Sequence, residues 1–332
     1  MDDATLDLLG HLITADGGMA QSRAFHRGSI LRIVHRRYVS TAYWNSLGPD
    51  DRYRLTTLAA LQTRPDATLM GPTSLYMGLS GVPTLRPQEV WLNTSRRQSV
   101  GTRSGGFRVE GTDEASRIAR SLPAPALRFC LREVPAPVVS GHLRLEPLLS
   151  ALAAMLLSTH SKEALCAADA AARMLKIADL STHDGLLDLI GHSASASARQ
   201  RALGLARMAD PLSESVGESF SRFVILDAGF PRPVLQHSFF DERGFIGRPD
   251  YWWPEFHLIG EFDGMEKYSN PEYGDRGPGQ RIRAEKERDG RLTRSEGQPL
   301  HWVWADQDQP GRLVGLLSAR GLSIDRTQRP WP

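Results

Sequence analysis

One segment, residues 247–264 with the sequence GRPDYWWPEFHLIGEFDG, limits the possible folds of this chain more than any other. Aromatic and aliphatic residues dominate two runs, 245–253 and 256–262, and a Pro-Glu pair separates these runs as a turn would. This composition predicts two adjacent β-strands.

Further elements are predicted on both sides of this pair of strands. They come in the order helix, strand, helix, strand and helix, over residues 214–227, 233–240, 280–296, 300–304 and 312–320. A helix, a three-strand meander, a second helix and a last strand together predict an α/β layer with one mixed sheet.

Several carboxylates gather at the end of the predicted meander. Because strand side chains alternate, Glu261 and Asp263 point to the same face, and pairing of the strands brings Asp250 beside that face. Converging carboxylates suit Mg²⁺ or Mn²⁺, which take oxygen ligands and can activate water against a phosphodiester. Asp250 and Glu261 are therefore the predicted metal ligands. Glu218 on the preceding helix is a fourth carboxylate, and Lys267 is the lysine nearest to this cluster.

The pattern Pro-Asp, spacer, acid-x-Lys resembles the signature of the PD-(D/E)XK nuclease superfamily. More specifically, residues 213–320 resemble the very-short-patch-repair-like endonuclease domain. The matching positions, in chain order, are Glu218, Ser219, Arg222, Gly229, Pro231, Pro233, Gln236, Asp250, Trp253, Pro254, Glu261, Asp263, Gly264, Glu285 and Arg288.

This resemblance implies a restriction-endonuclease-like mixed sheet flanked by helices and a metal-dependent DNA endonuclease. It implies catalytic roles for five residues, namely Glu218, Asp250, Glu261, Asp263 and Lys267. Three others, Gln236, Glu285 and Arg288, are expected to support the site or contact DNA, although the last two also fit a solvated ion pair on a helix. Asp263 stands where the superfamily has lysine, so we expect Lys267 to supply the positive charge.

A second feature lies near the N-terminus, where residues 17–49 contain no Asp or Glu. Basic side chains without acidic neighbours are typical of nucleic-acid contact, and the DNA-binding candidates are Arg27, Arg32, Arg36 and Arg37. The alternative is an arginine-rich, solvated hairpin. Residues 29–40 alternate as a strand–turn–strand, and with the short helix before them they outline a winged helix.

About residues 5–175 resemble the AbiEi-type antitoxin and regulator family, through the run RGSILRIVHRRYV and the segments that follow it. Only residues 19–25 separate the first helix and its terminal glycines from the wing, which predicts a degenerate winged helix. The expected domains are a winged-helix-like module (1–45), an α+β region (46–145), a helical connector (146–212) and the nuclease domain (213–332).

Composition narrows the class of protein. The chain is 41% hydrophobic and 23% charged with a net charge of +2, which excludes disordered and fibrous classes. Two cysteines exclude a disulfide framework, and without a signal peptide or membrane span we expect a cytoplasmic protein. The first hypothesis is a DNA endonuclease in phage defence or a toxin–antitoxin context. The alternatives are an antitoxin-like transcriptional regulator with an inactive nuclease fold, and a toxin or defence effector whose N-terminal region binds a partner protein, which for any of these hypotheses could be a toxin.

Overall fold

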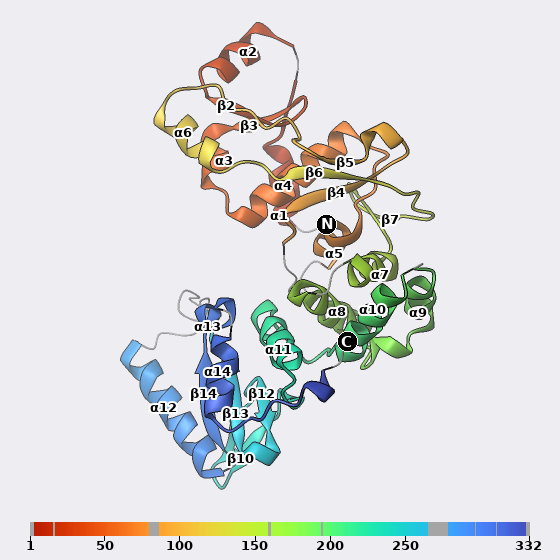
Figure 1. The fold of residues 1–332 in the computed structure, drawn as a ribbon. Helices are drawn as coiled ribbons and strands as arrows, with labels where there is room; N and C mark the ends of the chain where they lie inside the picture. Colours follow the sequence, from red (N-terminus) through yellow and green to blue (C-terminus); the bar gives the residue numbers. More distant parts are fainter. Residues whose placement is uncertain are drawn as a thin grey trace. The chain divides into compact units, whose positions relative to one another are not determined.

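The chain is a mixed α/β protein that divides into two compact units in the computed structural model (Figure 1). The structure describes residues 3–15, 17–79, 86–158, 161–193, 195–264, 278–295, 297–309 and 311–329. The first unit comprises the described residues up to 155, and the second comprises those from 156 onward. Within these ranges, none of the helices has both the length and the apolarity that crossing a bilayer requires.

The first unit begins with a small three-stranded antiparallel sheet in the order β1-β3-β2. Its elements are α1 (Asp3–Gly10), β1 (Ile13–Thr14), α2 (Met19–His26), β2 (Ile30–Val34), β3 (Arg37–Ser40), α3 (Thr41–Ser46) and α4 (Pro49–Thr63). The strand–turn–strand predicted over 29–40 is confirmed as β2 and β3. The helix before it, α2, is only eight residues long and contains no buried residue.

A second sheet in the same unit has the order β4-β6-β5, in which β4 and β6 run parallel and β5 is antiparallel. The elements here are α5 (Gly71–Gly78), β4 (Glu89–Thr94), η1 (Arg97–Ser99), β5 (Gly101–Arg103), α6 (Glu114–Ser121), β6 (Ala126–Leu131), β7 (Val138–Ser140) and β8 (Leu143–Leu145). One apolar core, with Trp44 and Tyr53 among its largest fully buried side chains, joins both sheets to α4.

Helix α7 (Leu148–Ser158) spans the boundary between the units, and three helices begin the second unit: α8 (Lys162–Leu175), α9 (Asp184–Gly191) and α10 (Ala196–Met208). After them come α11 (Val216–Ala228), β9 (Val234–Leu235), β10 (Phe239–Asp241), β11 (Gly244–Gly247), β12 (Tyr251–Trp253), β13 (Leu258–Phe262), α12 (Pro278–Ser295), β14 (Gln298–Trp302), α13 (Trp304–Asp308) and α14 (Arg312–Ala319).

The predicted mixed sheet is confirmed, with strand order β14-β13-β12-β9. The two strands β13 and β14 are parallel, and the others are antiparallel. The single strands expected over 233–240 and 245–253 are wrong in one respect, because each is two shorter strands. In the first, Gln236 has φ +51°, a left-handed conformation that ends an extended strand. Strands β10 and β11 then pair as a separate hairpin.

Alternation along β13 assigns its side chains to two environments. Leu258 and Phe262 belong to a core with Tyr251, Trp253 and Trp302. Helices α11 and α14 also contribute apolar side chains to this core. Ile259 belongs to a smaller core with Leu292 of α12. Figure 1 shows α12 beside this sheet, apart from α14. Glu261, two residues after Ile259, therefore lies on the α12 face of the sheet.

Helix α11 is fixed by polar bonds that are almost completely buried. Arg222 Nη1 donates to both carboxylate oxygens of Asp169 on α8 at 2.7 Å, and Arg222 also donates to the Met208 carbonyl oxygen. Ser219 Oγ donates to the same carboxylate at 2.7 Å. The side chains of Arg222 and Asp169 are 2% and 1% exposed, so water cannot replace this ion pair.

The Asp169–Arg222 pair gives a prediction about stability. Asp169→Asn should lower the free energy of unfolding by about 3–5 kcal/mol, because it leaves the Arg222 guanidinium buried without its counter-charge. Urea unfolding followed by circular dichroism measures this cost. The matched control is Asp308→Asn, which removes an exposed partner of Lys162 and should cost at most about 1 kcal/mol. Equal costs for the two variants would contradict the assigned role of the buried pair.

Candidate metal and catalytic site

Glu218 and Asp250 are joined by the side-chain amide of Gln236. Gln236 Nε2 lies 3.1 Å from Glu218 Oε2 and 3.3 Å from Asp250 Oδ1, so one amide group donates toward both carboxylates. The left-handed backbone of Gln236 places this amide at the break between β9 and β10. Glu218 Oε2 also accepts a 2.7 Å hydrogen bond from the Glu214 backbone N–H. Burial raises the pKa of the Glu218 carboxyl, against the effect of these donors.

Asp250 is tied to strand β13 at the position next to Glu261. Its Oδ2 accepts a 2.8 Å hydrogen bond from the backbone N–H of Phe262. The structure therefore connects three of the predicted residues to the same end of the sheet: Glu218 through Gln236, Asp250 directly, and Glu261 as the neighbour of Phe262.

Glu261 is buried, with a side chain only 4% exposed, and its two oxygens differ. Oε2 accepts a 2.5 Å hydrogen bond from Arg288 Nη2 on α12. Oε1 is also buried, yet no described residue donates a hydrogen bond to it. A buried carboxylate oxygen without a partner is costly, and this one is positioned to accept a ligand.

His301 lies directly opposite Glu261 in the parallel pairing of β13 with β14. Its Nδ1 is 3.1 Å from Asp263 Oδ2, and its Nε2 is 3.1 Å from Asp289 Oδ2 on α12. The hydrogen bond with Asp263 raises the pKa of His301 to about 9, burial opposes this rise, and the charges of Glu261, Asp263 and Asp289 add to it. At neutral pH the ring is therefore an imidazolium that donates from both nitrogens.

Two overlapping groups of side chains have the spacing of a metal site. The first is Glu261, Asp289 and His301, and the second is Asp263, Glu285 and His301. Within each group, one ligand atom per residue lies within 4.8 Å of the others. The first group contains Glu261, whose buried Oε1 has no donor among the described residues, and it leaves Asp263 to hold the other nitrogen of the His301 ring. That arrangement, in which a carboxylate orients a metal-binding imidazole, is common in metalloproteins.

The remaining predicted residues stand in different positions. Asp250 belongs to neither group of three, and its carboxylate accepts hydrogen bonds from the Gln236 side chain and the Phe262 backbone N–H. Glu285 belongs to the second group but is exposed. Lys267 lies outside the described residues. Arg288, expected only as a supporting residue or DNA contact, is the cation that contacts Glu261.

Among the wing arginines, two are engaged within the fold. Arg32 Nε donates to the Gly106 carbonyl oxygen at 2.7 Å, and Arg37 Nε donates to Gln62 Oε1 at 2.8 Å. Arg27 and Arg36 are exposed. The four predicted DNA-binding arginines thus comprise two that are held by other parts of the fold and two that are accessible to a ligand.

Sequence reasoning missed His301 and Asp289. His301 is one of ten histidines in the sequence, and its role depends on which strand pairs with β13 and in which register. Asp289 is four residues after Glu285 on α12, and this helical spacing, which puts both side chains on one face, could have identified it.

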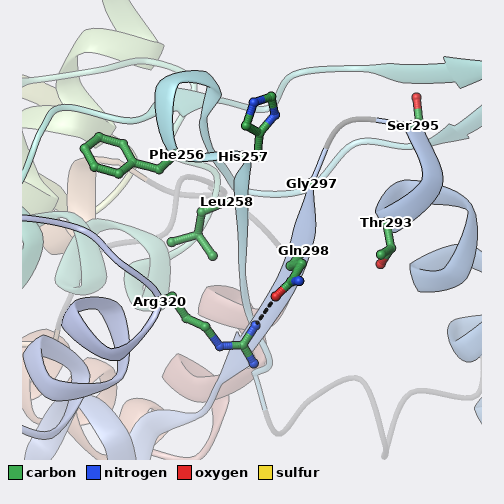
Figure 2. A pocket seen from close by; sticks show the side chains of 8 residues that line it. All are labelled: Phe256, His257, Leu258, Thr293, Ser295, Gly297, Gln298 and Arg320. Atoms are coloured by element: carbon green, nitrogen blue, oxygen red, sulfur yellow. Dashed lines mark hydrogen bonds between the residues drawn. The ribbon is translucent and has the colours of Figure 1, made fainter.

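A separate cavity of about 500 Å³ lies at the other end of the same two parallel strands, where β13 and β14 begin (Figure 2). His257, Gln298 and Arg320 are among its lining residues, and Arg320 Nη1 donates to Gln298 Oε1 at 3.4 Å. None of the carboxylates described above lines this cavity. It is therefore distinct from the candidate metal site.

Comparison with known proteins identifies relatives but no activity. No family model matches the chain, and no solved structure matches it. Two uncharacterized proteins from two strains of Mycobacterium tuberculosis are each 30% identical to it over 133 residues, which is 40% of this chain and 47% of each relative. The chain thus spans about half the length of the curated relatives that it matches.

The pKa of His301 gives a prediction about pH. The folded-state value, about 9, is above the ordinary value of 6.5, so the stabilisation is complete below pH 6.5 and is lost as the pH rises through 9. In EDTA, the free energy of unfolding should fall by at most about 3 kcal/mol over this interval. His301→Gln should remove this part of the pH dependence.

The control for this measurement is His142→Gln, which replaces an exposed histidine of the first unit and should keep the wild-type pH dependence. Denaturant unfolding at pH 6.5 and pH 9 provides the comparison. If wild type and His301→Gln lose the same free energy of unfolding between these two pH values, His301 is not a protonated ring held by Asp263 and Asp289.

Proposed function

We propose that residues 213–332 form a metal-dependent endonuclease domain of the PD-(D/E)XK type, which hydrolyses phosphodiester bonds in DNA. The observation that carries this proposal is the group of Glu261, Asp289 and His301, in which one ligand atom per residue lies within 4.8 Å of the others, together with the buried Oε1 of Glu261, to which no described residue donates a hydrogen bond. Carboxylate and imidazole donors around one buried oxygen are a donor set for a divalent metal ion.

The order of elements supports the same proposal. Helix α11, the antiparallel strands β12 and β13, helix α12 and the parallel strand β14 follow the arrangement that the resemblance implies for a restriction-endonuclease-like core. In this arrangement the Pro-Asp residue, Asp250, precedes β12, and the acid-x-acid pair ends β13. The hydrogen bond from the Phe262 backbone N–H to the Asp250 side chain brings these two motifs together.

The donor set distinguishes between the two expected metals. Mg²⁺ prefers an all-oxygen octahedral environment, whereas an imidazole ligand favours a transition metal such as Mn²⁺. Glu261, Asp289 and His301 would hold the ion, which would supply charge neutralisation at the phosphate and a more acidic bound water. His301 must lose a proton to ligate, so metal and proton compete for its Nε2.

The other residues of the site have roles that their contacts define. Asp263 accepts the hydrogen bond of His301 Nδ1, and it would therefore fix the ring with Nε2 directed at the ion. Glu218 acts as a positioning residue, because Gln236 joins its carboxylate to that of Asp250. Arg288 places a fixed positive charge beside Glu261, which is the charge that Asp263 cannot supply at the usual lysine position.

The proposal is tested by incubating the purified protein with plasmid, single-stranded DNA and RNA in Mn²⁺, Mg²⁺ or EDTA. DNA cleavage should require the divalent ion, and Glu261→Gln should reduce its rate at least about a hundredfold, since it removes a ligand. The control Glu255→Gln neutralises an exposed carboxylate at the β12–β13 turn and should cleave at the wild-type rate. Cleavage that persists in EDTA, or in Glu261→Gln, contradicts the proposal.

A second variant tests whether Arg288 supplies the positive charge of the site. Arg288→Met should lower single-turnover cleavage by about a hundred- to a thousandfold, the cost of losing one preorganised charge donor. It should not weaken Mn²⁺ binding, measured by titration calorimetry, because removing a positive charge beside Glu261 favours a cation there. The control is Arg243→Met, which removes an exposed arginine of the same unit. Near-normal cleavage by Arg288→Met would exclude Arg288 as the cation and leave Lys267 as the candidate.

A further inference from the structure

Three arginines border a cavity of about 590 Å³ in the first unit. Arg64 follows the last residue of α4, Arg96 precedes η1, and Arg103 ends β5. Separate segments of the chain thus bring three positive charges to one hollow of the surface. None of these residues belongs to the wing arginines or to the candidate metal site.

Two of these guanidinium groups share one aromatic ring. The Cζ atoms of Arg64 and Arg103 lie 5.0 Å and 5.8 Å from the centre of the Phe129 ring, which also lines the cavity. Burial and the charge of Arg103 lower the pKa of Arg64, as expected for neighbouring like charges. The ring attracts both cations but cannot neutralise them.

Asp66 also lines the cavity, but in the described structure it forms no ion pair with these arginines. In the part of the chain that the structure describes, none of the three guanidiniums forms an ion pair, and the side-chain hydrogen bonds of Arg64 and Arg103 go to neutral oxygens. Arg103 donates to the Gln98 carbonyl oxygen at 2.8 Å, and Arg64 donates to Thr63 Oγ1 at 3.0 Å. Most of the guanidinium N–H groups therefore stay available, in a planar arrangement that fits phosphate oxygens.

The rest of the lining suits the other parts of a nucleotide. Ser95 and Ser99 offer hydroxyl groups, and Asp66 offers an acceptor for a sugar hydroxyl or an exocyclic amine. The volume is within the range of small-ligand sites. The exposed guanidinium planes also provide surfaces on which a base can stack.

We propose that this cavity is a nucleotide-phosphate site, in which Arg64, Arg96 and Arg103 hold the phosphate. The phosphate belongs either to a free mononucleotide or to a nucleic-acid strand, and these two sources share one chemistry. This site is independent of the proposed nuclease activity, because it lies in the other unit and requires no metal.

The test is titration calorimetry of the full chain in EDTA, so that cleavage cannot interfere. The probes are uridine 5′-monophosphate, inorganic phosphate and a single-stranded DNA 12-mer with a 5′-phosphate. We expect the mononucleotide to bind more tightly than inorganic phosphate. Arg64→Gln and Arg103→Gln should each weaken binding at least about tenfold, whereas the exposed Arg117→Gln on α6 should leave it unchanged. Thermal melting of each variant confirms that the fold is retained.

Each outcome decides the question. Tighter binding of the 12-mer than of the mononucleotide assigns the phosphate to a nucleic-acid strand, and equal or weaker binding assigns it to a free nucleotide. Binding of inorganic phosphate as tight as that of the mononucleotide overturns the nucleotide assignment. Failure of all probes to bind, or the same affinity for wild type, Arg64→Gln and Arg103→Gln, overturns the site itself.

Discussion

The buried ion pair between Arg222 and Asp169 fixes the helix from which the candidate site is built. It holds α11 to α8, and one turn earlier on the same helix Glu218 reaches the site. Gly217 makes this placement possible, because a Cβ at this position would overlap the Phe262 ring. Helix α11 is thus anchored on one side by charge and on the other by close contact with β13. Glu218 has little freedom to move away from Gln236.

The parallel pairing of β13 with β14 sets the chemistry of the site. Its register places Glu261 beside His301, and alternation puts both on the α12 face, where Arg288 and Asp289 lie. A shift by one residue would replace His301 with an apolar neighbour and remove the donor set. The proximity of the Glu261 carboxylate, the His301 imidazole and the charged residues of α12 therefore depends on the register of this one pair of strands.

Sequence patterns predicted the elements better than they predicted the site. The helix–meander–helix–strand order of the second unit follows from local composition, because strand and helix periodicities are local signals. The break at Gln236 could not be predicted from local composition. It depends on a left-handed backbone conformation, which usually falls on glycine but here falls on a glutamine. His301 was missed because β14 pairs with β13 although helix α12 separates the two strands in the sequence, and local patterns do not predict such a pairing. Asp250 and Glu261 were found from strand alternation and Arg288 through the resemblance, and the contacts of all three could be found only in three dimensions.

The central claim is that Glu261, Asp289 and His301 hold a divalent metal ion. The most direct measurement is anomalous diffraction from crystals of the protein grown with Mn²⁺ above pH 7, where the metal competes best with the proton on His301. An anomalous peak is expected in contact with Glu261 Oε1 and His301 Nε2, with Asp263 still bonded to Nδ1. An empty site at saturating Mn²⁺, with His301 still bridging Asp263 and Asp289, would contradict it.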